Sequence, residues 1–224
     1  MHSEGKHPLE HGKYRAAIFD LDGVIVDTAK YHYLAWKRLA NELGFDFAEQ
    51  ENERLKGVSR MRSLEILLEI GGLDLDEVEK TALAEKKNTW YVEYIREMDE
   101  SELLPGAREY LLRLGGKGVK VALGSASKNT PTIINSLNIV DLFDAVVDGN
   151  KTSKAKPDPE VFLLAAQELG VDPADCVVFE DAEAGLQAAR AAGMVAIGVG
   201  DPGVLKSAHE VIAGLHAVNV EGLF

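Results

Sequence analysis

Short apolar runs that end in acidic or hydroxyl residues constrain the fold of this chain more than any other feature. The run Ala16–Phe19 ends at Asp20 and is too short for a helix, so we interpret it as a buried strand. Similar runs follow at residues 119–124, 176–179 and Val195–Val199. A chain with several such runs is expected to build a sheet whose strands are buried on both faces.

Helical stretches separate these runs. Residues 105–114, 159–169 and 182–192 have helical patterns, with proline at the start of two of them and Gly170 or Gly193 as a stop signal. Alternating strands and helices predict an α/β fold with a parallel sheet covered on both faces. Ligands of such sheets bind beyond the carboxyl ends of the strands, where Asp20, Ser125, Glu180 and Asp181 fall.

One long stretch interrupts this alternation. Residues 28–100 contain helical patterns at 31–43, 61–70 and 75–98 and no convincing strand. We therefore predict a helical cap at 28–100, inserted into a core made of residues 14–27 and 101–224. Residues 1–13 are polar and are interpreted as a disordered leader or tag.

Composition limits the classes of function. The 224 residues carry a net charge of -13, which argues against a nucleic-acid or anionic-membrane surface. No apolar run approaches the roughly 18 residues that a membrane helix needs. The single cysteine, Cys176, lies in an apolar run and is expected to be a buried core residue. These features predict a cytoplasmic protein, which we expect to be a monomer.

Acidic residues gather at two of the predicted strand ends. Asp20 and Asp22 belong to the sequence FDLDGVIVDT, in which Gly23 lets the chain turn. Glu180 and Asp181 end another run. Acids crowded at one edge of a sheet cost electrostatic energy unless a cation neutralises them, and carboxylate oxygens suit Mg²⁺. An ordinary strand-to-turn junction is the alternative for Asp20 and Asp22, because aspartate is common in turns.

A serine and a lysine stand where a phosphate would be held. Ser125 follows the run VALG, and its hydroxyl and the neighbouring amides are candidate phosphate ligands. Lys156 precedes two prolines that stiffen its loop. Taken alone, Ser125 could be a helix cap and Lys156 a solvated surface residue.

In this order, FDLDG, Ser125, Lys156 and Glu180–Asp181 resemble the haloacid dehalogenase superfamily of phosphotransferases. The resemblance covers nearly the whole chain after the leader and implies a Rossmann-like core with a mobile cap. It implies that Asp20 is the nucleophile and Asp22 the general acid and base. It also implies Mg²⁺ held by Asp20, the Asp22 carbonyl, Glu180 and Asp181, and a transferred phosphoryl group held by Ser125, Ala126 and Lys156.

A narrower resemblance, to the β-phosphoglucomutases, rests on four further stretches: DTAKYHYLAWK, LKGVSR, AEKKN and GSASKN. It implies conversion of β-glucose 1-phosphate to glucose 6-phosphate through glucose 1,6-bisphosphate. The residues that it assigns to the sugar and to the distal phosphate are His32, Trp36, Lys56, Gly57, Ser59, Arg60, Lys87, Ser127, Lys128 and Asn129. Read singly, His32 could be a helix-face histidine and Lys87 a solvated helix lysine.

Two other functions stay open at this stage. The same core would serve a cytoplasmic sugar-phosphate phosphatase, in which water accepts the phosphoryl group. A non-catalytic module switched by phosphorylation of Asp20 is the other alternative, although the large helical insertion speaks against it. One departure from the family pattern is Ala182, where serine is common, so one hydrogen bond near the metal is expected to be lost.

Overall fold

The computed structural model describes residues 12–55, 59–217 and 222–224. The chain divides into two compact units, one made of Met1–Asp27 and Asp99–Phe224 (unit 1) and one made of Thr28–Met98 (unit 2). The predicted insertion ended at residue 100, whereas unit 2 ends at Met98. Of the predicted leader, residues 1–11 lie outside the described residues, and Gly12 donates a backbone hydrogen bond to the carbonyl of Gly222.

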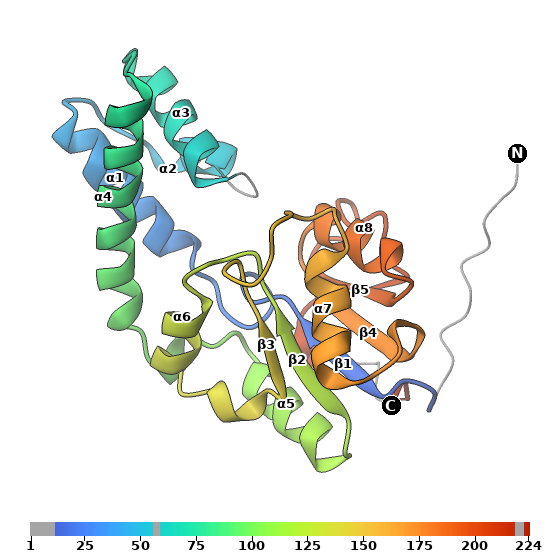
Figure 1. The fold of residues 1–224 in the computed structure, drawn as a ribbon. Helices are drawn as coiled ribbons and strands as arrows, with labels where there is room; N and C mark the ends of the chain where they lie inside the picture. Colours follow the sequence, from blue (N-terminus) through green and yellow to red (C-terminus); the bar gives the residue numbers. More distant parts are fainter. Residues whose placement is uncertain (1–11, 56–58, 218–221) are drawn as a thin grey trace, which may run out of the picture. The chain divides into compact units, whose positions relative to one another are not determined.

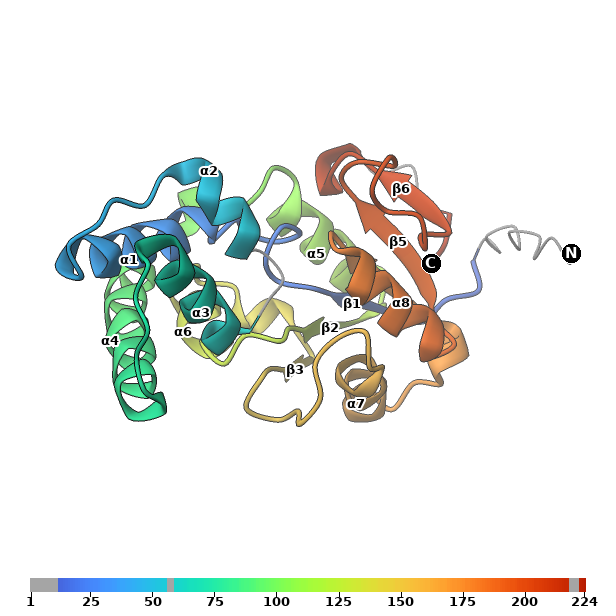
Figure 2. The same ribbon diagram turned by 90° about the horizontal axis from the view of Figure 1, so that it is seen from above.

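Unit 1 contains a six-stranded sheet, and all of its paired strands are parallel. The strand order is β3-β2-β1-β4-β5-β6, of which Figure 1 labels β3, β2, β1, β4 and β5, and Figure 2 labels β6 beside β5. The strands are β1 (Ala16–Phe19), β2 (Lys120–Gly124), β3 (Ala145–Val147), β4 (Cys176–Glu180), β5 (Val195–Val199) and β6 (Glu210–Ile212). The four predicted runs are strands in the structure. The two strands that the sequence did not reveal, β3 and β6, have 3 residues each and lie at the two edges of the sheet.

Helices cover both faces of this sheet, as Figure 2 shows for α5 and α7. Because side chains alternate along a strand, Ile18 and Val178 join one core cluster with Phe162 of α7. On the other face, the rings of Phe19 and Phe179 stack at 4.7 Å, and Tyr110 of α5 meets Phe19 edge-on. The helices of unit 1 are α5 (Ala107–Gly116), α6 (Thr130–Ser136), α7 (Glu160–Leu169) and α8 (Glu183–Ala191), with 3-10 turns η2 (Glu100–Glu102), η3 (Val140–Leu142), η4 (Pro173–Asp175) and η5 (Leu215–Ala217).

Within its described residues, 28–55 and 59–98, unit 2 consists of helices joined by loops and contains no strand. Its long helices α1 and α4 pack against each other, and α3 packs against α4. Asp76 and Glu79 form a capping box that starts α4, and Gly72 ends α3 in a left-handed conformation. The elements are α1 (Ala29–Glu42), α2 (Glu49–Asn52), η1 (Glu53–Leu55), α3 (Arg60–Gly71) and α4 (Glu77–Arg96).

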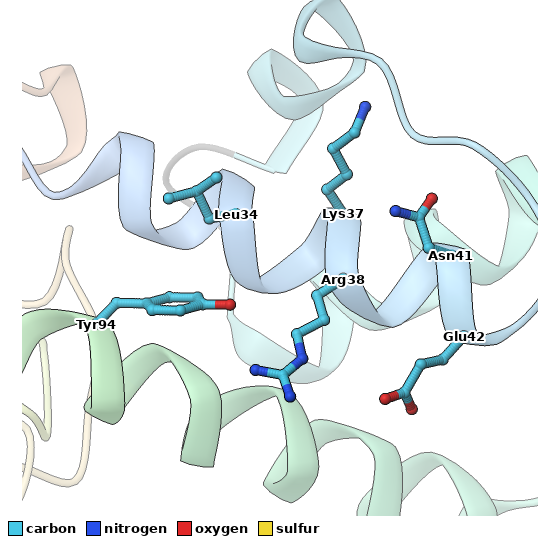
Figure 3. Close-up of a pocket in the computed structure, with 6 residues that line it drawn as sticks. All are labelled: Leu34, Lys37, Arg38, Asn41, Glu42 and Tyr94. Carbon is cyan, nitrogen blue, oxygen red and sulfur yellow. The ribbon is translucent and has the colours of Figure 1, made fainter.

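A shallow hollow lies between α1 and α4 on unit 2, and none of the predicted site residues lines it (Figure 3). Its two cations already have partners: Lys37 donates to Asp46, and Arg38 lies over the ring of Trp90. We therefore assign the hollow no role in the site. Among the described residues, no helix combines the length and the apolar character that a membrane crossing would need.

Candidate active site

The core of the candidate site is an acidic cluster in unit 1 at the carboxyl ends of β1 and β4. Asp20 directly follows β1, and its backbone N–H donates to the Phe179 carbonyl at 2.9 Å, so it stands level with Glu180. Oxygen atoms of Asp20, Glu180 and Asp181 all lie within 4.8 Å of one another. Parallel strands with ends in register thus bring together acids that are 160 residues apart in the sequence.

Lys156 neutralises part of this charge. Its Nζ donates to Asp20 Oδ1 at 2.6 Å and to Glu180 Oε2 at 2.7 Å, and its side chain is only 11% exposed. Burial by itself would lower the pKa of Lys156, but the two carboxylates outweigh it and raise that pKa. The interpretation of Lys156 as a solvated surface lysine is therefore wrong.

Lys156 does not neutralise the whole negative charge around Glu180 and Asp181. Burial, followed by the charge of Asp20, raises the pKa of Glu180 and the pKa of Asp181 well above their usual range. Asp22 also raises the pKa of Asp181, which shows that its carboxylate acts on the same cluster. A divalent cation would lower these pKa values, and hard oxygen donors suit Mg²⁺, so the residues present fit this metal.

Two glycines make room for the acids. A Cβ on Gly23 would lie 2.0 Å from Asp181 Oδ2, and one on Gly185 would lie 2.1 Å from the carboxyl carbon of Glu180. Gly23 also has a φ of 77°, which glycine adopts without strain. Strand β1 ends at Phe19, so the turn at Gly23, and not a straight strand, sets the position of Asp22.

The loop after β2 carries the residues that were predicted to hold phosphate. Ser125 is buried, and its Oγ accepts the N–H of Ser127 at 3.1 Å, while the Ser127 Oγ accepts the N–H of Asn129 at 3.2 Å. Helix α6 starts only at Thr130, so Ser125 is not its cap. Ala126 and Lys128 are exposed, and Ser127 and Asn129 are half-buried.

A turn that the sequence did not single out supports this loop. The backbone N–H of Gly149 donates to the Ser127 carbonyl at 3.2 Å, and Asn150 Nδ2 donates to the Lys128 carbonyl at 3.0 Å. A Cβ on Gly149 would lie 2.3 Å from the Ala126 carbonyl oxygen. The run DGN is a turn signal in the sequence, but only the neighbouring ends of β2 and β3 reveal what it touches.

Unit 2 brings together three of its predicted site residues, His32, Trp36 and Lys87, in a buried basic and aromatic cluster. Lys87 Nζ lies 2.8 Å from His32 Nδ1, and it sits over the rings of Trp36 and Tyr91 at 4.4 and 4.9 Å. The His32 ring stacks on Tyr91 at 4.1 Å. Lys87 is 2% exposed, so its interpretation as a solvated lysine is wrong.

Burial and the charge of Arg60 favour the neutral forms of His32 and Lys87. Burial, and then the neighbouring charge of Arg60, lower the pKa of Lys87 to about 7. Burial, Lys87 and Arg60 together hold the pKa of His32 well below its usual value. Tyr91 was not predicted for this site, although its spacing of four residues from Lys87 on α4 places both on one helix face.

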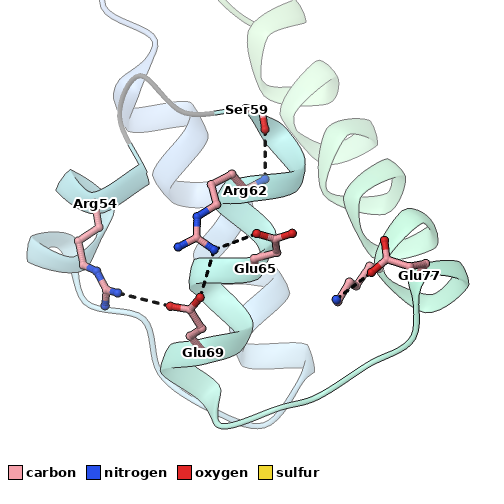
Figure 4. Close-up of polar contacts among 7 residues, drawn as sticks. Arg54, Ser59, Arg62, Glu65, Glu69 and Glu77 are labelled. Atoms are coloured by element: carbon pink, nitrogen blue, oxygen red, sulfur yellow. Dashed lines mark hydrogen bonds and ion pairs between the residues drawn. The ribbon is translucent and has the colours of Figure 1, made fainter.

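Arg60 is the first residue of α3. Hydrogen bonds and ion pairs hold the neighbouring polar side chains of this helix in place (Figure 4). The Ser59 Oγ accepts the N–H of Arg62 at 3.2 Å and caps the helix. Arg62 pairs with Glu65 at 2.8 Å and with Glu69 at 3.2 Å, and Arg54 also lies near Glu69. The predicted residues Lys56 and Gly57 lie outside the described residues.

Comparison with known proteins agrees with this geometry. The sequence pattern of the haloacid dehalogenase-like hydrolases matches residues 14–193. The chain belongs to this family. It is 48% identical over 188 residues to the β-phosphoglucomutase of Bacillus subtilis (strain 168), covering 83% of each chain. It is 38% identical over 189 residues to a fructose-1-phosphate phosphatase of Escherichia coli (strain K12), covering 84% of this chain and 97% of that one.

A solved structure of a haloacid dehalogenase-like relative gives the same result. The crystal structure of a β-phosphoglucomutase from Clostridium difficile aligns with a TM-score of 0.82 at 43% identity, covering 92% of this chain and 93% of that one. Family membership and the parallel α/β fold predicted from the sequence are thus confirmed. The similarity extends to mutases and phosphatases alike, so the reaction has to be argued from the site.

Proposed function

We propose that this protein is a Mg²⁺-dependent phosphotransferase that interconverts β-glucose 1-phosphate and glucose 6-phosphate. The observation that carries the mutase assignment is the basic cluster of unit 2, in which Lys87 Nζ lies 2.8 Å from His32 Nδ1 and the charge of Arg60 acts on both residues. A mutase must bind a second phosphate without reacting with it, whereas a phosphatase needs only one phosphate site. Greater identity to a mutase than to a fructose-1-phosphate phosphatase, 48% against 38%, supports the same choice.

In unit 1, Asp20 is proposed to attack phosphorus. A bond forms between its carboxylate oxygen and phosphorus while the bond from phosphorus to the sugar oxygen breaks, leaving an aspartyl-phosphate. Asp22 donates a proton to the leaving sugar oxygen and takes one from the hydroxyl that attacks in the return step. Lys156, Ser125 and the amide of Ala126 hold the transferred group.

Mg²⁺ would be held by the carboxylates of Asp20, Glu180 and Asp181 and by the Asp22 carbonyl. When bound, it neutralises charge on the transferring phosphoryl group. Lys156 supplies one positive charge to Asp20 and Glu180, to which it donates at 2.6 and 2.7 Å.

The second phosphate is proposed to bind His32, Arg60 and Lys87 of unit 2. In unit 1, the segment Ser127–Asn129 is a separate candidate for phosphate contacts. Arg60 suits a dianion because its guanidinium offers two parallel N–H donors. Between the two transfers, glucose 1,6-bisphosphate turns around, so that each of its phosphates faces Asp20 once.

The phosphatase is the second candidate, and the relative from Escherichia coli favours it. In that case water attacks the aspartyl-phosphate and free phosphate is released. Product analysis with β-glucose 1-phosphate and a trace of glucose 1,6-bisphosphate separates the two. Glucose 6-phosphate is the expected product. If free phosphate formed faster than glucose 6-phosphate, the result would favour the phosphatase over the mutase.

The distal phosphate site is tested by Arg60→Ala. Loss of a charged, bidentate contact is expected to cost roughly 1.5–3 kcal/mol, and thus about 10- to 100-fold in mutase turnover. Phosphorylation of Asp20 by acetyl phosphate should survive. Arg62→Ala is the matched control, because Arg62 lies two positions further along the same helix and pairs with Glu65 and Glu69. Equal turnover in wild type and Arg60→Ala would remove Arg60 from the site.

A further inference from the structure

Glu160, the first residue of α7, folds back onto the loop that carries Lys156. Its carboxylate accepts three hydrogen bonds from that loop. Glu160 Oε2 accepts the N–H of Ser153 at 2.9 Å and the N–H of Lys154 at 2.6 Å, while Oε1 accepts the Ser153 hydroxyl at 3.0 Å. A carboxylate that binds two consecutive backbone amides fixes the local path of the chain as well as one side chain.

Asp158 closes the same loop from within. Its Oδ1 accepts the N–H of Glu160 at 3.0 Å, and its Oδ2 pairs with Lys154 Nζ at 3.2 Å. The N–H of Asp158 donates to the Ala155 carbonyl at 3.0 Å. The two ends of segment 153–160 are thus tied together, with Lys156 between them.

The base of this loop is rigid because α7 is anchored in the core. Val161 and Phe162 are buried, and Phe162 belongs to the cluster that includes Ile18 of β1. Lys156 Nζ lies 4.9 Å from the centroid of the Phe162 ring. Helix α7 is thus held in place by the core. The Glu160 carboxylate binds the backbone of Ser153 and Lys154 to this helix, and so fixes the position of the chain just before Lys156.

We propose that Glu160 is a positioning residue that sets the Lys156 ammonium against Asp20 and the transferred phosphoryl group. The inference rests on the proposed role of Asp20 as nucleophile. Glu160 has no part in the assigned chemistry, and its carboxylate is occupied by the loop. A displacement of about 1 Å in a catalytic group can cost on the order of 100-fold in rate. Loss of the three bonds is therefore expected to slow phosphorylation of Asp20 by about 10- to 100-fold.

The experiment is a double-mutant cycle on the full chain with Mg²⁺, with acetyl phosphate as donor and mass spectrometry of Asp20 as readout. Glu160→Ala and Lys156→Ala should each be slow, and the double variant should be no slower than Lys156→Ala, because Glu160 acts through Lys156. Glu160→Gln, which keeps one acceptor oxygen, should fall between wild type and Glu160→Ala. Glu168→Gln is the control, because Glu168 lies on the same helix as Glu160 and the variant loses only its pair with Lys151, a residue of the preceding loop.

Two outcomes overturn the inference: a wild-type rate in Glu160→Ala, or effects that multiply in the double variant. Failure of the wild type to become phosphorylated at Asp20 would instead count against the proposed function. In that event the crystal structure of Glu160→Ala decides the inference. Displacement of Lys156 Nζ from Asp20 and Glu180 is expected, and an ammonium still in contact with both carboxylates would refute the positioning role.

Discussion

Two lysines with little exposed surface, one in each unit, differ in the sign of their pKa shifts. Lys156 in unit 1 has a side chain that is 11% exposed, and Lys87 in unit 2 is 2% exposed. The pKa of Lys156 is raised by Asp20 and Glu180, against the effect of burial. The pKa of Lys87 falls to about 7 through burial and the charge of Arg60. The neighbouring charges, and not the degree of burial, decide which way the pKa moves.

The difference separates two kinds of site. Lys156 is the counter-ion of an acidic cluster and stays protonated throughout the physiological range. Lys87 stands near the charge of Arg60 and over two aromatic rings, where an incoming anion would stabilise the charged form of Lys87. Unit 1 is thus arranged to receive a cation beside Lys156, whereas the cluster in unit 2 is expected to favour a phosphate.

The largest effect is expected when Lys156 is replaced by methionine. Without Mg²⁺, the change leaves Asp20 and Glu180 without their shared partner, and removal of one member of a buried pair costs roughly 3–5 kcal/mol. The loss should be smaller at pH 5 than at pH 8, because the pKa of Glu180 is raised to about 8 and its protonation at pH 5 removes an uncompensated charge. Urea denaturation at both pH values measures it. Lys151→Met, which loses a pair that is 46% exposed on the lysine side, should change stability little.

Mg²⁺ should stabilise the fold through the acidic cluster of unit 1 and not through the basic cluster of unit 2. The metal supplies positive charge to the acids in addition to that of Lys156. At 100 times its dissociation constant, a ligand that binds only the folded state stabilises it by about 2.7 kcal/mol. Thermal unfolding at pH 8 with Mg²⁺ and with excess chelator measures this gain. Asp181→Asn should lose most of the gain, whereas Lys87→Met should keep it. A gain that is equal in wild type and Asp181→Asn would place the metal elsewhere.

Lys87 should make folding stability rise with pH. Its folded pKa is about 7 against an ordinary value of 10.5, so between these values only the unfolded chain holds the proton. Stability attributable to Lys87 therefore rises by up to about 1.4 kcal/mol per pH unit in this window and is flat below it. Comparison of unfolding free energies from pH 7 to pH 10 should show this slope in wild type but not in Lys87→Met.

Lys86→Met is the control for that measurement. Lys86 is 49% exposed, pairs with Glu42 and neighbours Lys87 on α4, so the variant changes the same helix without emptying the buried site. It should retain the slope of the wild type. Identical pH profiles in wild type and Lys87→Met would contradict the assignment of the shift to Lys87.

The smallest effect is expected from Ala182→Ser, which leaves both lysines untouched. Ala182 occupies the position before α8 with extended backbone and no side-chain cap. A serine there can accept a helix N–H, which stabilises the fold by about 1 kcal/mol. Thermal unfolding measures the gain, and no change would show that the helix start is already satisfied, for instance by the Gly185 N–H donating to the Ala182 carbonyl at 3.1 Å.

The Lys87 environment shows where reasoning from the sequence reached its limit. Helical spacing could relate Lys87 to Tyr91 and His32 to Trp36, since each pair is four residues apart. It could not bring His32 to within 2.8 Å of Lys87, because that contact depends on how α1 packs against α4. The same holds for Glu160. The sequence KPDPE shows that a glutamate stands there, but it does not show that this glutamate accepts hydrogen bonds from residues 153 and 154.

Local chemistry in the sequence by itself determined the four longest strands, the main helices and the residues at the strand ends. Apolar runs of 4 or 5 residues and glycine stops are short-range signals, and they need no knowledge of distant contacts. Only the tertiary structure decided that Lys156 bridges Asp20 and Glu180, since that depends on strand order and on the path of a loop. The pKa shifts follow from the same cause, because a charge responds to its neighbours in space and not to those in the chain.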